Sequence, residues 1–315
     1  MSAPDDQLVQ LIASELAAPV SAGAARLAAH IRARHGDAVR AIVFYGSCLR
    51  TGDDQHSLLD FYVVVDSYWR IGTRRAFALL NALVPPNVYY VQLTERGRTV
   101  QAKYAVVSMA DFARCTSPHA FQAYFWARFA QPCALVYASD AAAREAVTAA
   151  LANAVTAFVQ HGLTLVGAPC SVEALWTTQL TWSYRAELRA ERTAVAEWLY
   201  AAAADRYERV TRAALSRLPI AAAMERADGT LQITTGAAVT AATAAWRVRR
   251  YYGKLLSLLR ILKSALTQEG SVDYAIWKVE RHSGLKVDPA WRHKRHPFLA
   301  LGEEVWRMYR KGAFR

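Results

Sequence analysis

A glycine–serine turn between two apolar segments is the first feature of this chain that could carry chemistry. Tyr45-Gly46-Ser47 ends one apolar segment, and after a polar stretch Leu59-Asp60-Phe61-Tyr62-Val63-Val64-Val65 places one acid on another. The backbone N–H groups of such a turn and the Ser47 hydroxyl can face a triphosphate, and Asp60 can hold the divalent ion that neutralises it. The pattern therefore predicts a site for a nucleoside triphosphate and a metal ion.

Asp60 is the strongest candidate metal ligand, because an unpaired carboxylate on a hydrophobic strand is costly. The alternative is a capping or salt-bridged aspartate. Sites that bind a triphosphate and a metal ion in this way usually have a second acid two residues after the first. Tyr62 occupies that position here, and its side chain either hydrogen-bonds a phosphate or simply packs against its neighbours. Asp66 is the second candidate ligand, on the same strand face. It would lie roughly 20 Å from Asp60 in a straight strand, so it shares the ion only if the strand bends sharply, and otherwise it is a strand-end aspartate.

Two basic residues are candidates for binding phosphate. Lys103 lies in the apolar segment Ala102-Lys103-Tyr104-Ala105-Val106-Val107, where a lysine is expensive to bury without an anionic partner. A phosphate or Asp60 itself would supply that partner, and the alternative is an exposed sheet face. Arg128 either binds phosphate or caps the C-terminus of a helix, and the sequence leaves both readings open.

Glu187 and Glu191 lie four residues apart and therefore share one face of a predicted helix. Such a pair can complete a metal site or accept a proton. The alternative is a set of surface ion pairs with the neighbouring arginines Arg185, Arg189 and Arg192.

The elements that must position these residues divide the chain in two. Hydrophobic periodicity and turn residues predict an α+β fold, in which a small mixed sheet flanked by helices precedes an almost purely helical, alanine-rich part. The predicted domains are 1–139, 140–296 and a basic amphipathic C-terminal helix, 297–315. The predicted strands are 41–46, 59–65, 88–93, 100–108 and 133–137, and the predicted helices are 5–17, 22–35, 71–83, 141–161, 172–190, 194–216, 238–268 and 298–311.

Composition excludes several classes of protein. The 315 residues are 54% hydrophobic and 20% charged, as in a folded protein rather than a disordered one. The four cysteines are widely spaced, which argues against a zinc site and a disulfide scaffold and favours a reducing compartment. We find no signal peptide, transit peptide or transmembrane segment, so we expect a cytoplasmic protein.

Positive charge is concentrated in the last quarter of the chain. The formal net charge is +12, and residues 246–315 hold sixteen Lys or Arg against six Asp or Glu, an excess of ten. A membrane surface and a nucleic acid are both suitable partners. Segments 246–266 and 298–314 mix basic residues with Trp, Tyr and Leu, which is typical of helices at a membrane interface. We expect the first to be a core helix and the second to contact the membrane.

Six short blocks occur in a fixed order along roughly 41–190. They are Tyr45-Gly46-Ser47, Leu59-Asp60-Phe61, Val88-Tyr89-Tyr90, Lys103-Tyr104 with Val107-Ser108, Arg128-Phe129-Ala130-Gln131-Pro132, and Ser183-Tyr184 with Glu187 and Arg189. In these blocks the chain resembles the mitochondrial-type phosphatidate cytidylyltransferases, peripheral CDP-diacylglycerol synthases of the translocator assembly and maintenance protein family, and the resemblance is weak beyond them.

The resemblance implies a nucleotidyltransferase-like (DNA polymerase β-like) domain followed by a helical domain. It also implies that CTP and Mg²⁺ convert phosphatidate into CDP-diacylglycerol and pyrophosphate. The family pattern likewise lacks an acid at the Tyr62 position, but it commonly reads Gly-Ser-Gly where this chain has Cys48, whose side chain would crowd the phosphate turn. The expected site has catalytic Asp60, Lys103 and Glu187, metal ligands Asp60 and Asp66, and CTP-binding Gly46, Ser47, Cys48, Tyr62, Arg128, Tyr184 and Arg189.

The expected partners are CTP, phosphatidate and an anionic membrane surface bound through the basic C-terminus, with the protein peripheral on the inner face of the membrane. No nucleic acid is expected. Two alternatives stay open: nucleotidyl transfer to RNA or to a small soluble acceptor, and a degenerate nucleotidyltransferase fold that serves as a non-catalytic scaffold.

Overall fold

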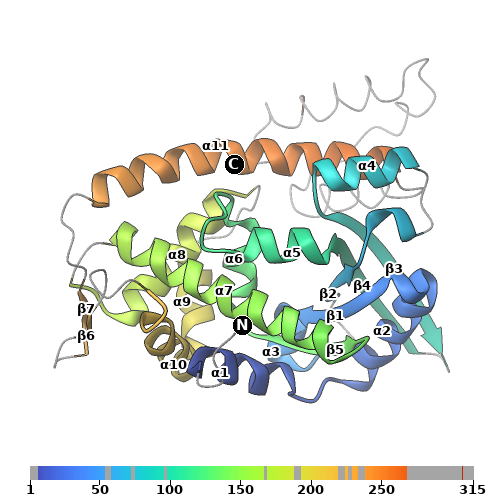
Figure 1. Ribbon diagram of the computed structural model, residues 1–315, viewed down its shortest axis with the longest axis horizontal. Helices are drawn as coiled ribbons and strands as arrows, with labels where there is room; N and C mark the ends of the chain where they lie inside the picture. The colour runs from blue at the N-terminus through green and yellow to red at the C-terminus, as the bar shows by residue number, and fades with distance from the viewer. Residues whose placement is uncertain are drawn as a thin grey trace.

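A computed structural model describes most of the chain as helices packed on both faces of a sheet (Figure 1). The described residues are 6–53, 58–71, 75–95, 98–166, 169–187, 193–218, 224–225, 229–232, 238–267 and Arg307. The predicted C-terminal helix, 297–315, otherwise lies outside them.

The central sheet has five strands in the order β3-β4-β2-β1-β5. β2 and β4 run parallel, whereas the other neighbours are antiparallel, so the sheet is mixed as predicted. A two-stranded β6–β7 ribbon lies apart from it. The strands are β1 (Val39–Tyr45), β2 (Leu59–Val65), β3 (Asn87–Glu95), β4 (Arg98–Ser108), β5 (Cys133–Ala138), β6 (Met224–Glu225) and β7 (Leu231–Gln232).

Helices cover both faces of the sheet because its central strands are apolar on both sides. Alternate residues of a strand point to opposite faces. Tyr62 and Val64 therefore join a core with α1, α5, α6 and α7, whereas Phe61 and Val63 join a second core with α2 and α4. These helices are α1 (Gln7–Leu16), α2 (Ala22–His35), α4 (Arg75–Leu83), α5 (Met109–Thr116), α6 (Ala123–Phe129) and α7 (Ala141–Val166).

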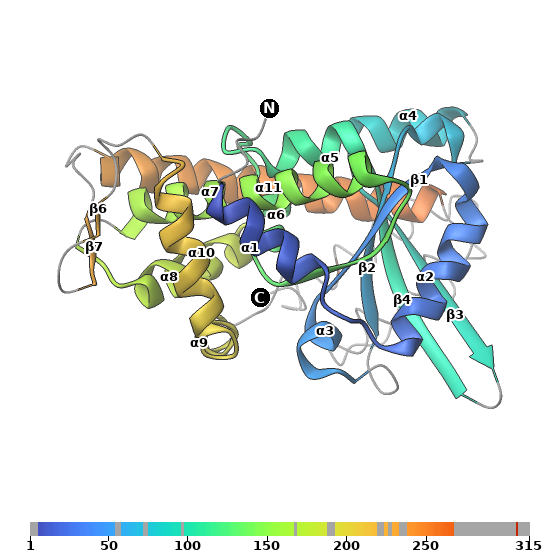
Figure 2. The ribbon, with the colours of Figure 1, turned by 60° about the horizontal axis from the view of Figure 1, so that its bottom comes forward.

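The later helices gather beside one end of the sheet, and α11 runs along the length of the molecule (Figures 1 and 2). Among the described residues α7 alone is long and apolar enough to cross a membrane, but 67% of its most apolar window is buried. It is the central helix of the larger core, in contact with α1, α5, α6, α8, α10 and α11. The later helices are α8 (Val172–Arg185), α9 (Thr193–Ala201), α10 (Ala204–Leu215) and α11 (Ala238–Thr267).

The larger core does not stop at the predicted domain boundary after residue 139. It joins Val43 and Tyr62 of the sheet to Phe158 of α7 and Trp176 of α8. The helical part therefore covers one face of the sheet. Residues on both sides of position 139 belong to this core. The division of the chain into two domains there stays a prediction.

The elements that the sequence did not predict are short, and one predicted helix is two. The first group comprises the two-residue strands β6 and β7, the helices α3 (Ser47–Thr51), α5 and α6, and the 3₁₀ turns η1 (Gly36–Ala38) and η2 (Tyr68–Arg70). One to three turns hold too few residues to display a helical period. The predicted helix 194–216 is divided into α9 and α10 at Ala202 and Ala203, where no Gly or Pro signals a break.

Candidate functional site

A row of side chains across three strands forms the centre of the site. Asp60 of β2 pairs in register with Tyr45 of β1 and with Lys103 of β4, so the three residues lie side by side on one sheet face. Lys103 Nζ lies 2.9 Å from Asp60 Oδ1. The two side chains are 30% and 16% exposed, so the ion pair lies at the edge of the core, where a ligand can reach it. The predicted anionic partner of Lys103 is thus confirmed as Asp60.

Gly46 brings the turn after β1 directly against this acid. Its φ of +93° is one that residues with a side chain rarely adopt. A Cβ atom added at Gly46 would lie 2.7 Å from Asp60 Oδ2. Ser47 follows at once as the first residue of α3. The turn and the acid, predicted from spacing, are therefore in contact in space.

The Cys48 side chain does not crowd the turn, contrary to our expectation. It is buried, and its thiol donates to the carbonyl of Leu58 at 3.2 Å. Burial and the nearby charge of Asp60 raise the pKa of the thiol. The Cys48 side chain packs into the smaller core, where a residue without a side chain would leave a cavity.

Tyr62 lies two residues beyond Asp60 on the same face, but it is wholly buried. Its hydroxyl accepts a hydrogen bond from Arg128 at 3.2 Å, and its ring packs edge-on against Phe129. A ligand cannot contact it without opening the core. The predicted direct contact of Tyr62 with CTP therefore does not fit this packing, in which the Tyr62 hydroxyl is occupied by Arg128.

Arg128 connects the sheet to the end of α8. Besides Tyr62 it donates to Glu187 Oε2 at 3.3 Å, and its guanidinium lies 4.1 Å from the centre of the Tyr124 ring. Burial disfavours the charge, but Tyr124, Tyr62 and Glu187 outweigh that cost and raise the pKa of Arg128. Arg128 therefore stays a cation inside the protein, and it neither caps a helix in solvent nor lies free for phosphate.

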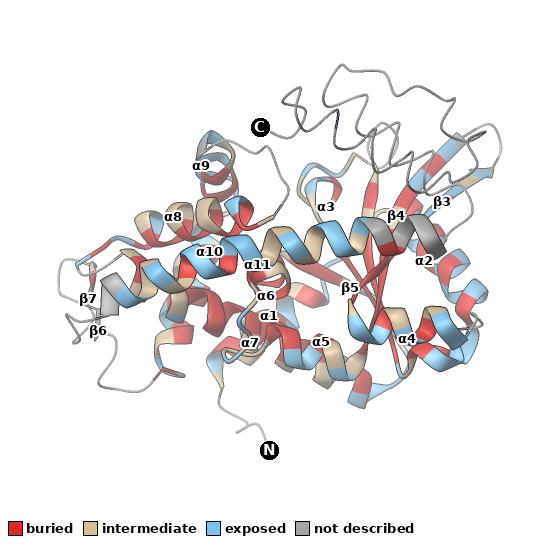
Figure 3. Ribbon diagram, turned by 90° about the horizontal axis from the view of Figure 1, so that it is seen from above, coloured by how far each residue is buried: buried red, intermediate tan, exposed pale blue. Residues whose placement is uncertain are grey.

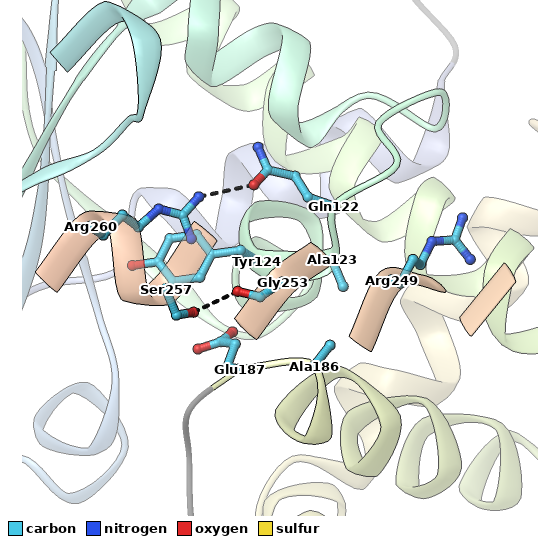
Figure 4. Close-up of a pocket in the computed structure, with 9 residues that line it drawn as sticks. All are labelled: Gln122, Ala123, Tyr124, Ala186, Glu187, Arg249, Gly253, Ser257 and Arg260. Carbon is cyan, nitrogen blue, oxygen red and sulfur yellow. Dashed lines mark hydrogen bonds between the residues drawn. The ribbon is translucent and has the colours of Figure 1, made fainter. Parts of the chain in front are cut away.

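Glu187 pairs with the buried Arg128, whereas Arg189 and Arg192, two of its predicted surface partners, lie outside the described residues. The Glu187 side chain is 12% exposed and faces a small pocket between α6, the end of α8 and α11 (Figure 4). On the opposite wall Arg260 of α11 lies 4.0 Å from the Tyr124 ring centre and donates to Gln122 at 2.9 Å. Tyr124 is thus held between two guanidinium groups. Although burial opposes ionisation, Arg128 and Arg260 prevail and lower the pKa of Tyr124.

Two predicted residues, Asp66 and Tyr184, are not brought to the row, and a third, Arg189, cannot be placed. Asp66 follows the far end of β2, roughly 20 Å from Asp60 along the strand, and pairs with Arg70. No sharp bend interrupts the register of β2 with β4, so Asp60 and Asp66 cannot bind one ion. Tyr184 is buried in the last turn of α8. Arg189 lies outside the described residues.

Sequence reasoning missed Tyr124, Arg260 and a contact between α3 and α9. In the last, Arg50 lies 5.6 Å from the ring of Trp198, which is 51% exposed. The Arg50 Nε atom is buried without a hydrogen-bond partner among the described residues. No local signal identifies the contact of Arg260 with Tyr124 or that of α3 with α9, because each joins different parts of the chain.

The donor set near the row suits one kind of metal ion. Among the described residues no three His, Cys, Asp or Glu side chains cluster closely enough to hold an ion by themselves. Asp60 Oδ1 is buried and makes no hydrogen bond of good geometry, although Lys103 is close enough for a charge contact. One carboxylate with a spare acceptor fits Mg²⁺ that takes its other ligands from phosphates and water. It does not fit an ion caged by protein.

Neither protein-family models nor curated protein sequences give a match to this chain. The resemblance described above therefore rests on the residues quoted for it.

Proposed function

We propose that this protein is a CTP:phosphatidate cytidylyltransferase whose mixed-sheet part is a nucleotidyltransferase-like fold. The observation that carries the proposal is the contact of Gly46 with the Asp60–Lys103 pair. A glycine turn, an acid and a lysine that lie together at a partly exposed edge are the groups that a nucleoside triphosphate with its metal ion requires.

The proposed reaction joins two phosphates. An oxygen of the phosphatidate phosphate forms a bond to the α-phosphorus of CTP, the bond from that phosphorus to the α–β bridging oxygen breaks, and pyrophosphate leaves. Phosphatidate already carries negative charge near neutral pH, so a strong general base is not essential. A site with one accessible acid beside a lysine is compatible with such an acceptor, because the main task of the site is to offset the charge of the phosphates.

Each residue has a role in this proposal. Gly46 and Ser47 hold the triphosphate, and Lys103 turns from Asp60 to a phosphate oxygen when the nucleotide binds. Asp60 would hold Mg²⁺, which when bound neutralises the charge that develops on the phosphates. Arg128 positions the wall of the site through Tyr62 and Glu187, so Glu187 acts as a positioning residue rather than as a second metal ligand.

The proposed location follows from the acceptor. Phosphatidate lies in a bilayer, so the enzyme works as a peripheral protein on the inner, cytoplasmic face of the membrane. The basic segment 297–315 is a proposed membrane contact by its composition.

The decisive experiment incubates the full-length protein with labelled CTP, Mg²⁺ and phosphatidate in detergent micelles and measures CDP-diacylglycerol. We expect Asp60→Asn to lower kcat/KM by about 10²–10³, as when a group that stabilises transition-state charge is lost. Gly46→Ala should act in the same direction, because the new Cβ displaces the Asp60 carboxylate. Asp66→Asn removes the same charge from the other end of β2 and should leave the rate unchanged.

Three outcomes would overturn the proposal. One is a wild-type protein that makes no CDP-lipid, and another is an Asp60→Asn variant with undiminished activity. The third is transfer of CMP to RNA or to a soluble acceptor in preference to phosphatidate. A scaffold without catalysis would also show no Mg²⁺-dependent rise in Tm with CTP.

A further inference from the structure

α11 turns a continuous apolar face away from the protein. The exposed members recur every three or four residues, so they form one face of the helix. Tyr251 is the most exposed, at 77%, and pale blue marks exposed residues along the ribbon of α11 in Figure 3. Its members are Val248, Tyr251, Tyr252, Leu255, Leu258 and Leu259.

The face continues beyond α11 onto the loop before α6. Phe121 is 42% exposed, and its ring centre lies 5.9 Å from that of Tyr252. Arg249 fixes this loop by donating to the Phe121 carbonyl at 2.8 Å. The apolar surface therefore includes a second element held at a constant position, so we define the α11 face as the six residues above together with Phe121.

Basic residues border this face. α11 contains six Lys or Arg and no Asp or Glu. Arg247, Arg250 and Lys254 follow one another at spacings of three and four, so they form a row beside the apolar one. No ion pair joins any of the three to the part of the chain that the structure describes. Within that part of the chain, the border is thus a row of cations without an acidic partner.

The opposite side of α11 is anchored, so the face is preformed. Trp246 is buried against Trp126, and Gly253 meets the end of α8 without room for a side chain. Lys263 is buried and donates to the carbonyls of Val84 and Pro86 at 2.7 and 2.9 Å. The inward basic residues hold the helix in place, while the outward ones remain at the surface.

We propose that the α11 face docks the protein on an anionic phospholipid surface. An apolar face bordered by cations on one rigid helix matches the acyl–headgroup boundary of such a membrane. A second copy is a poor occupant, because two-fold pairing would bring rows of like charge together. A nucleic acid would leave the apolar residues in water. The choice of a lipid surface rests on the proposed function, and this assignment revises the expectation that 246–266 is a core helix.

The test measures binding of the full-length protein to vesicles by flotation, without CTP. The vesicles are phosphatidylcholine alone or mixed with an anionic phospholipid. We expect Tyr251→Ser/Leu255→Ser/Leu258→Ser to weaken binding at least tenfold. Neutralising the border by Arg247→Gln/Arg250→Gln/Lys254→Gln should weaken it on the order of a hundredfold on anionic vesicles and little on phosphatidylcholine. Leu79→Ser/Leu83→Ser removes exposed leucines from α4 and should have no effect.

The possible outcomes separate the candidate occupants. If removal of 297–315 abolishes flotation while the serine variant floats as wild type, the terminal segment is the anchor and the proposal is wrong. It is also wrong if the serine variant changes a dimer into a monomer with unaltered flotation, or if the wild type binds RNA and no vesicle. Asp60→Asn should float normally, so failure of the proposed chemistry leaves the docking result intact.

Discussion

The charges at the centre of the site neutralise each other before any ligand binds. Asp60 and Lys103 face each other at 2.9 Å on neighbouring strands. An exposed pair of this kind contributes little to stability, but a partly buried one avoids the cost of an isolated charge. A bound triphosphate with its cation offers both residues an alternative partner. The pair is therefore suited to exchange partners, which agrees with the proposed role of the site.

Tyr62, at the position where the proposed function would lead one to expect a second acid, has a structural role. Tyr62 holds Arg128, and Arg128 in turn holds Glu187. This link places a carboxylate of the later helices beside the sheet but leaves it neutralised. Glu187 is thus engaged by Arg128 rather than available as a second acid beside Asp60.

A buried histidine makes stability depend on pH. His35 ends α2, and its Nε2 lies 3.1 Å from the Tyr104 hydroxyl. Burial, followed by the charge of Arg34, lowers the pKa of His35 to about 4 from 6.5. Between these values the unfolded chain binds a proton that the folded one does not, so stability is retained above pH 6.5 and falls as the pH drops towards 4. The loss amounts to about 3 kcal/mol at most.

We therefore expect His35→Gln to remove about 2–3 kcal/mol of the difference in unfolding free energy between pH 7 and pH 4.5, measured by urea denaturation. His30→Gln changes an exposed histidine of the same helix and should keep the wild-type pH dependence. Equal pH dependence in wild type and His35→Gln would contradict the assignment.

At the scale of elements, the crossing of α11 over the end of α8 decides how the pocket is closed. Gly253 lies where a Cβ would be 2.3 Å from the carbonyl oxygen of Ala186, the residue before Glu187. Backbone against backbone is possible at this distance because glycine has no side chain. The close approach of α11 to the end of α8, beside Glu187, therefore depends on the absence of a side chain at Gly253.

Gly253→Ala should destabilise the protein by about 2 kcal/mol or more, measured by urea denaturation, because overpacking forces the two helices apart. The sign is informative, since the same change at an unhindered helical position would stabilise it by up to about 1 kcal/mol. Ser257→Ala lines the same pocket without adding an atom and should stay within about 0.5 kcal/mol of wild type. A stabilised Gly253→Ala would show that the helices do not cross so closely.

At the scale of the whole molecule, one core joins the sheet to the helical part. The face of the sheet that carries Tyr62 and Val64 is covered by α7, whose sequence lies beyond the predicted boundary at residue 139. A fragment that ends there would expose this face to water. Burial of apolar surface is the main favourable contribution to folding, so such a fragment would lose much of the stability of the sheet.

We accordingly expect a single unfolding transition, with far-ultraviolet circular dichroism and tryptophan fluorescence giving the same midpoint. Fragment 1–139 should fail to fold by itself, and fragment 1–166, which adds α7, should recover part of the native circular dichroism. Two separated transitions, or a stable fragment 1–139, would establish two independent domains instead.

Local pattern was enough to predict most of the sheet and the long helices. β2 was predicted at 59–65 and is found there, and α2 was predicted at 22–35 and is found there. Apolar residues alternate along a strand and recur every three or four residues along a helix, and both patterns are visible within a short segment of sequence. The same reasoning identified Gly46, Asp60 and Lys103, because a turn residue and charges in apolar strands are locally unusual.

The partners of these residues were decided by the tertiary structure. The sequence determined an α+β chain with an acid, a lysine and a glycine turn suited to a triphosphate, and a basic C-terminal quarter. It could not determine that Arg128 joins Tyr62 to Glu187, or which side of α11 faces outward. Each of these depends on surfaces brought together from distant segments, and a contact across the fold leaves no periodic signal in the segments that make it.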